Sequence, residues 1–173
     1  MLEREAVEIK EAYRDYKPPI PAAKIVHDLL QFVPAKYLIG LDCVVLSNLS
    51  GQPRRKRLGK TTSRGRRVAQ LRVAGLYHQR WKGQPPWIEL YMDQILRRFP
   101  RWALWIPLIN RLAIGRTLYH EVGHHIHYTV RPEYREEEDV ADDWGKRLSR
   151  RFLRRRYFYL VPIAKIISLF WRK

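Results

Sequence analysis

Four of the six histidines in this 173-residue chain lie in one short stretch, residues 118–128, which reads LYHEVGHHIHY. No proline interrupts the sequence between residues 108 and 129, and Leu118, Val122 and Ile126 recur at intervals of four. Apolar residues at this spacing fall on one face of a helix. The sequence therefore predicts an amphipathic, half-buried helix from about Pro107 to Thr129, which the following Arg-Pro pair ends.

His120, Glu121 and His124 form an H-E-x-x-H pattern on this helix. Residues i and i+4 lie on one helix face with Cα atoms ~6 Å apart, so both imidazoles can reach one zinc ion at ~2.0–2.1 Å. Glu121 lies about 100° around the helix, where its carboxylate can approach a water beside the metal without binding the metal. The spacing predicts two zinc ligands and one general base. A helix with surface histidines and a chance glutamate is the alternative.

His127 returns to the same helix face as His120, but the helix rises ~10.5 Å over those seven residues. No glycine lies between His124 and His127 to bend the chain sharply, so His127 is disfavoured as a third ligand. We expect His127 and Tyr128 to contact substrate or the transition state, and His125 to be structural or solvated.

An acidic cluster follows the histidines. Residues 133–143 hold seven acidic side chains, in a chain with 34 Lys and Arg against 17 Asp and Glu and a net charge of +17. A helix is predicted from about Glu133 to Arg156, and its dipole favours acids in the first turn. The helix dipole does not explain why Glu138 and Asp142 recur at i and i+4 beside the apolar Trp144. We expect the third metal ligand here.

The sequence HEVGH followed by EDVADDWG resembles the gluzincin zinc peptidases, whose pattern is H-E-x-x-H and then E-x-x-A/S-D on a second helix. The match covers roughly residues 118–146. The short strands before the motif helix also resemble the small single-domain peptidases called minigluzincins. The resemblance implies one Zn²⁺ held by His120, His124 and Glu138, with Glu121 as the general base and Asp142 bonded to the far nitrogen of a histidine ligand.

The resemblance leaves two points open. Glu137 is an alternative third ligand, because it directly precedes Glu138. No tyrosine, histidine or arginine of this chain can be matched to a family position that stabilises the transition state.

Short apolar runs precede the motif helix. Strands are predicted at residues 37–47, 68–77 and 87–91, the last leading into a helix that ends near Leu96. The run at 87–91, WIELY, is the candidate sheet edge for an extended substrate, which makes Trp87 and Glu89 candidate substrate contacts.

The predicted fold class is α+β: a small, mostly antiparallel sheet packed on the H-E-x-x-H helix and the following glutamate helix, as in zincins. We divide the chain into three parts. They are an N-terminal helical segment at 1–33, with helices at 2–16 and 22–32, a zincin-like catalytic domain at 34–156, and an apolar and basic C-terminal segment at 157–173.

Two basic segments are candidates for binding an anionic surface, either nucleic acid or membrane lipid: Arg54 to Arg67 and Lys146 to Arg156. A solvated hairpin loop is the alternative for the first, which lacks the interleaved aromatics that single-strand binding requires. The segment 157–173 has three interpretations: packing on the domain, resting on a membrane surface, or covering the cleft and keeping the protein latent.

A single cysteine, Cys43, rules out an internal disulfide partner and a cysteine zinc site, and we expect it buried in a strand. The absence of disulfides favours a cytoplasmic location, with membrane association through the C-terminal segment as an addition. The charged N-terminus predicts no secretory signal, and no apolar run reaches the ~18 residues of a spanning helix.

The predicted activity is zinc-dependent hydrolysis of peptide bonds in a peptide or protein substrate. Two alternatives are an inactive zincin homologue and a basic nucleic-acid-binding protein with a structural zinc site. The latter needs a fourth protein ligand, for which His127 is the nearby option.

Overall fold

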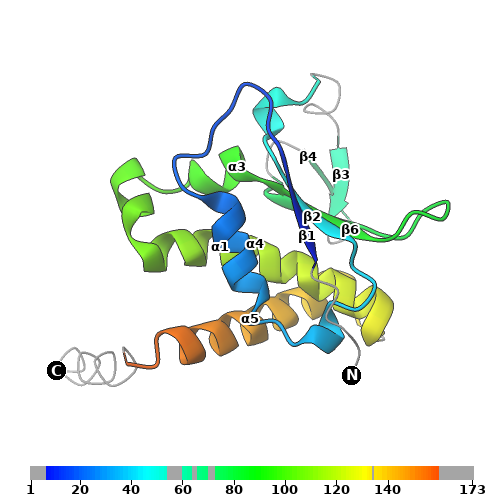
Figure 1. Cartoon of the computed structure of the whole chain (residues 1–173). Helices are drawn as coiled ribbons and strands as arrows, with labels where there is room; N and C mark the ends of the chain where they lie inside the picture. Colours follow the sequence, from blue (N-terminus) through cyan, green and yellow to red (C-terminus); the bar gives the residue numbers. More distant parts are fainter. Residues whose placement is uncertain (1–6, 54–59, 64–65, 70–72, 134, 160–173) are drawn as a thin grey trace.

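The computed structural model describes residues 7–53, 60–63, 66–69, 73–133 and 135–159. Its centre is a four-stranded sheet in the order β1-β2-β6-β5 (Figure 1). These strands are Glu8–Ala12 (β1), Cys43–Ser47 (β2), Trp87–Tyr91 (β6) and Gly75–His78 (β5). An antiparallel pair, Lys60–Ser63 (β3) and Arg66–Ala69 (β4), forms a separate hairpin. The α+β class predicted from the sequence is confirmed.

Two predictions from the sequence are wrong, one on strand direction and one on a helix. The pairings of β1 with β2 and of β2 with β6 are parallel, so the sheet is mixed, not mostly antiparallel. The reason is that each parallel pair is joined by a long connection, which for β1 and β2 includes a helix. The helix predicted at residues 2–16 is also wrong, because β1 occupies part of that segment and pairs with β2.

The strand predicted at 68–77 is divided between β4 and β5, and that at 37–47 is shortened to β2. A 3₁₀ turn, Ala35–Tyr37 (η1), occupies the start of the predicted strand. Gly40 follows with a φ of +79°, which is outside the extended region, so the strand begins only after it. The strand at 87–91 is present as β6. It lies between β2 and β5, so the prediction that it is the sheet edge is wrong.

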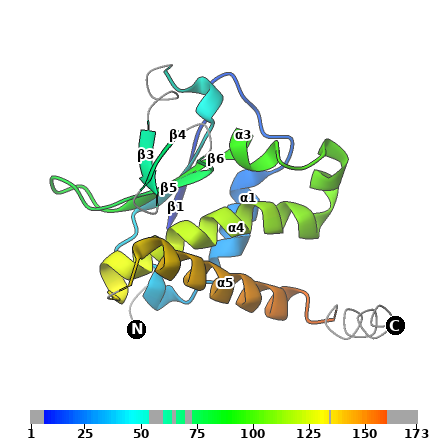
Figure 2. The same ribbon diagram turned by 180° about the vertical axis from the view of Figure 1, so that it is seen from behind.

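Apart from the segment 2–16, the helices lie close to the ranges predicted from the sequence. They are Ala22–Leu30 (α1), Met92–Leu96 (α3), Pro107–His125 (α4) and Glu137–Arg156 (α5), with 3₁₀ turns at Leu49–Gly51 (η2) and Arg101–Trp105 (η4). Helix α4 continues into a π-helical turn, Ile126–Val130 (η5). Helices α4 and α5 run antiparallel beside each other below the sheet (Figures 1 and 2).

The apolar face of α4 lies in the core, where Leu118, Val122 and Ile126 are fully buried as their spacing predicts. Gly123 lets α5 approach closely, because a Cβ there would lie 2.6 Å from the carbonyl oxygen of Ala141. This close packing places the first turn of α5 over the histidines of α4.

Cys43 is buried in β2, as expected. Within the described residues no helix has the length and apolar character to cross a membrane. Residues 160–173 and most of the basic run from Arg54 to Arg67 lie outside the described residues, and so do the predictions made for them.

Candidate metal centre

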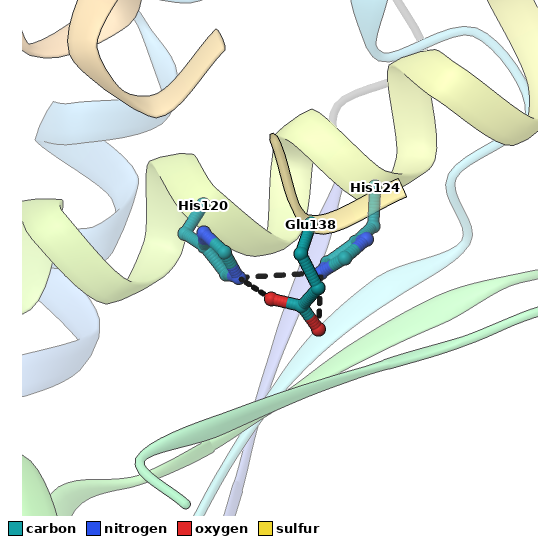
Figure 3. A group of neighbouring side chains, drawn as sticks. All are labelled: His120, His124 and Glu138. Atoms are coloured by element: carbon teal, nitrogen blue, oxygen red, sulfur yellow. Dashed lines mark hydrogen bonds and ion pairs between the residues drawn. The ribbon is translucent and has the colours of Figure 1, made fainter. Parts of the chain in front are cut away.

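Three side chains from two helices converge beneath the sheet. His120 and His124 project from α4, and Glu138 reaches them from the first turn of α5 (Figure 3). The Nε2 atoms of the two histidines are 3.2 Å apart. The Glu138 carboxylate lies 3.5 Å from the first Nε2 and 4.0 Å from the second.

These three side chains could hold one metal ion. Ligands at 2.0–2.1 Å in a tetrahedron lie about 3.3 Å from one another. The two Nε2 atoms are 3.2 Å apart, while Oε2 of Glu138 lies 3.5 Å from His120 and its Oε1 lies 4.0 Å from His124, so one ligand atom from each residue can be chosen within 4.8 Å of the others. Among the residues that the structure describes, the group contains His120, His124 and Glu138 and no fourth ligand. Three protein ligands of N, N and O type with one open position are typical of a catalytic zinc site.

A carboxylate faces the far ring nitrogen of each histidine. Asp142 places Oδ1 3.0 Å from Nδ1 of His120, and Glu137 places Oε1 3.2 Å from Nδ1 of His124. The Tyr128 hydroxyl donates a hydrogen bond to the other oxygen of Glu137. The Asp142 contact favours Nδ1 of His120 as the protonated nitrogen, which leaves its Nε2 free for a metal. The Nδ1 of His124 is buried and, although Glu137 lies 3.2 Å away, it forms no hydrogen bond within the described residues.

Asp142 therefore lies where the family resemblance implies. Glu137 lies beside Nδ1 of His124 and outside the group of His120, His124 and Glu138, so its place favours a role beside a ligand over the role of third ligand. Sequence reasoning missed this role. A second acid next to Glu138 was the available signal, but the direction of its side chain depends on how α5 packs on α4.

The electrostatics of the two histidines differ. Burial lowers the pKa of His120, but a hydrogen bond to Glu138 and the charges of Glu121, Glu138 and Asp142 outweigh it, so the pKa is raised. Burial and the neighbouring His120 lower the pKa of His124. Neutral imidazole is the form that binds a metal, and a lowered pKa keeps His124 in that form at neutral pH.

Glu121 lies beside the ligand group and is only 6% exposed. Burial raises its pKa to about 7, against a lowering by His120 and by a hydrogen bond from the backbone N–H of Tyr77. Gly75 of β5 passes so close that a Cβ there would lie 2.8 Å from Oε1 of Glu121. A carboxylate with a pKa near neutrality, held against the strand, is suited to accept and return a proton.

The ligand group opens into a cleft of about 790 Å³. Its wall is the backbone and side chains of residues 73–77, which include most of β5, and its other side is formed by α4 and α5. Sequence reasoning missed this wall, because it placed the edge of the sheet at β6. The residues 73–77 carry no motif that could have identified them.

Trp87 and Glu89 do not line this cleft. The Trp87 ring stacks on His78 at 3.8 Å. Glu89 is buried inside the sheet, where it accepts hydrogen bonds from the hydroxyl groups of Ser47 and Tyr91. Their sequence-based assignment as substrate contacts depended on β6 being the edge, and that premise is wrong.

His127 and Tyr128 lie on the π-helical turn η5, and neither lines the cleft. The Nδ1 of His127 accepts a hydrogen bond from the backbone N–H of Glu133. The Tyr128 ring stacks on Tyr77 of β5, at 5.9 Å between ring centroids. Tyr128 therefore acts on the site through Glu137 and Tyr77.

His125 is fully buried, and it joins three parts of the fold. Its Nδ1 accepts a hydrogen bond from the Tyr77 hydroxyl at 3.2 Å, and its Nε2–H donates to the carbonyl oxygen of Ile39 at 3.1 Å. His125 thus fixes β5 above α4. The structural interpretation of this histidine is confirmed, although no local pattern in the sequence identifies its partners.

Comparison of the chain with protein-family models, with curated proteins and with solved structures found no match.

Proposed function

We propose that this protein is a zinc-dependent hydrolase that cleaves peptide bonds. The observation that carries the proposal is the convergence of His120, His124 and Glu138, with one ligand atom of each within 4.8 Å of the others, in an open cleft beside a buried glutamate. A structural zinc site would be closed by a fourth protein ligand, and the group has three among the described residues.

Zinc is the metal that this donor set fits, through Nε2 of each histidine and the carboxylate of Glu138. When bound, zinc would supply a Lewis acid that activates water and polarises a carbonyl oxygen. Asp142 and Glu137 would hold the two imidazoles in the orientation and tautomer that binding requires.

Glu121 carries the proton transfers in this proposal. It lies one residue from a ligand and is shielded from bulk water by β5. Its carboxylate takes a proton from the attacking water and gives it to the leaving nitrogen of the substrate. The backbone N–H of Tyr77 orients the carboxylate for both transfers.

The substrate site is the outer edge of β5. Among the described strands β5 pairs with β6 alone, so its other edge faces the cleft. An extended peptide can add to such an edge through main-chain hydrogen bonds, which suits cleavage of a polypeptide chain. The edge strand and the proposed metal centre border the same cleft. Because an extended peptide can pair with the strand and a small ester cannot, this arrangement favours peptide hydrolysis.

The test combines metal analysis with hydrolysis of casein and of fluorogenic peptide mixtures. We expect about one zinc per chain and an activity that a chelator abolishes. The Glu121→Gln variant should retain zinc and lose at least about 100-fold in rate, the usual contribution of a general base. A protein that hydrolyses nothing when loaded with zinc, or a Glu121→Gln variant with full activity, would refute the proposal.

A further inference from the structure

The cleft has ends of opposite charge. At the metal end it is lined by the carboxylates of Glu137, Glu138 and Asp142. At the other end it is lined by Arg98, Arg116 and Arg150, and Lys146 lies between the two groups along α5. Arg98 follows α3, Arg116 lies on α4 and Arg150 on α5, so the fold brings together three cations that are far apart in the sequence.

These three arginines are exposed, and none forms an ion pair within the described part of the chain. Fifteen of the 17 acidic residues lie in that part, since Glu3 and Glu5 alone fall outside it. Three like charges facing one cleft attract an anion, and planar guanidinium groups bind carboxylates in a bidentate manner. The positive charge at this end of the cleft therefore favours binding of a ligand that carries carboxylate groups.

The positions of the arginines give the distance of such a carboxylate from the reacting bond. Arg116 precedes His120 by one helical turn, about 6 Å along α4, and Arg150 follows Glu138 by twelve residues, about 18 Å along α5. An extended peptide advances about 3.3 Å per residue. Arg116 and Arg150 thus lie about two and about five substrate residues, respectively, from the candidate metal centre.

The direction of β5 determines whether the substrate carboxylates lie before or after the scissile bond. Gly75 lies over Thr117, and Tyr77 lies beside His125, so β5 runs along α4 from the arginine end toward the metal end and beyond. A peptide that pairs antiparallel to β5, the more stable pairing, runs the opposite way. Its carboxy-terminal half then lies at the arginine end.

We infer that the cleft selects polypeptides with carboxylate groups about two to five residues after the scissile bond, bound by Arg98, Arg116 and Arg150. This inference rests on the proposed function for its reference to a scissile bond. The carboxylate can come from an acidic side chain or from the C-terminus of the substrate. Both sources present the same chemistry to the arginines.

Binding is measured by fluorescence anisotropy with the full-length, zinc-loaded Glu121→Gln protein, so that the result does not depend on hydrolysis. The probes are four labelled peptides of one sequence, with Glu or Gln in the second half and with a free or an amidated C-terminus. We expect Arg116→Ala/Arg150→Ala to weaken binding of the Glu peptides by about tenfold, as for two exposed ion pairs of up to ~1 kcal/mol each. The effect should shrink at high salt.

The matched control is Arg154→Ala/Arg155→Ala, which removes the same charge from exposed positions of α5 that do not line the cleft. It should change binding less than twofold. Preference for Glu in the amidated peptides assigns the site to side chains, and preference for the free terminus in the Gln peptides assigns it to the chain end. Equal binding of all four peptides, or equal losses in the two double variants, would overturn the inference.

A second measurement locates cleavage sites by mass spectrometry in a peptide mixture treated with the unsubstituted protein. Acidic residues or a chain end should be enriched two to five positions after the cleaved bonds, and enrichment before those bonds overturns the inference. If nothing is cleaved, the proposed hydrolase activity fails, while the anisotropy series still decides whether the arginines bind carboxylates.

Discussion

At the scale of single residues, the candidate metal centre consists of three side chains that could hold a metal ion and of the carboxylates beside the two histidines. The H-E-x-x-H spacing predicts His120 and His124 because helix geometry alone puts them on one face. Glu138 is identified through the family resemblance, and the structure brings it to the same point. Glu137 and His125 were not assigned their partners, because these contacts depend on how α5 and β5 pack on α4.

The carboxylates behind the histidines lead to a first prediction. Glu137→Gln and Asp142→Asn should each weaken zinc binding by about 10- to 100-fold, because each removes the charge that fixes an imidazole. Competition with a chromogenic chelator measures this. Asp139→Asn is the control, since Asp139 is exposed on the same helix turn and lies outside the ligand group. Equal zinc affinity in all three variants would contradict the assigned roles.

The buried His125 gives a prediction for pH. Burial lowers its pKa, against a smaller opposing effect of the Ile39 carbonyl, so the folded protein resists protonation of this ring. Its contribution to stability is complete above the unfolded pKa of about 6.5 and is lost as the pH falls below that value. Melting temperatures of zinc-free protein between pH 8 and pH 5 should therefore fall more steeply for the unsubstituted chain than for His125→Gln. Equal slopes of melting temperature against pH in the two proteins would exclude His125 as the source of the pH dependence.

At the scale of elements, the helices followed from local periodicity and the sheet did not. The apolar spacing of α4 and the proline at its first position define that helix without reference to the rest of the chain. The order and direction of strands depend on long connections, which no short run of residues encodes. For this reason β1 was mistaken for helix, and β6 was placed at the edge in place of β5.

The packing of α4 on α5 leads to a prediction at this scale. Gly123→Ala should lower stability by about 1–3 kcal/mol and weaken zinc binding, because the added methyl group meets the Ala141 backbone and moves Glu138 from the histidines. Gly115→Ala on the same helix is the matched control. Its Cβ would meet side-chain atoms of Leu29 and Tyr119 at 3.4 Å or more, and alanine is the better helix former. Urea unfolding and zinc titration of both variants check this. A Gly123→Ala protein as stable as Gly115→Ala would contradict it.

At the scale of the whole molecule, the described strands and helices border a cleft that is lined by the candidate metal ligands and by three arginines. The net charge of +17 predicts an affinity for anions without locating it. The basic segment from Arg54 to Arg67 lies in part outside the described residues, the segment from Lys146 to Arg156 lies on α5 and supplies Arg150, and Arg98 and Arg116 belong to neither. Charge in a cleft arises from tertiary contacts and cannot be read from runs of residues.

Zinc should stabilise the folded chain as a whole, because its ligands come from two helices that separate on unfolding. At a zinc concentration of 100 times the dissociation constant, the gain is about 2.7 kcal/mol. Differential scanning fluorimetry with added zinc and then with excess chelator measures this. We expect a higher melting temperature with zinc and a return to the lower value with chelator. Identical melting curves would contradict a zinc site that joins α4 to α5.

The central claim is that His120, His124 and Glu138 bind one zinc ion together, and its most direct test is the zinc content of purified protein and of Glu138→Ala. After zinc loading and extensive dialysis, we predict about one ion per chain in the unsubstituted protein and a large loss in Glu138→Ala. A matched Glu136→Ala variant, altered at an exposed acid before α5, should retain its zinc. An unsubstituted protein without zinc, or a Glu138→Ala protein that keeps a full equivalent, would contradict the account.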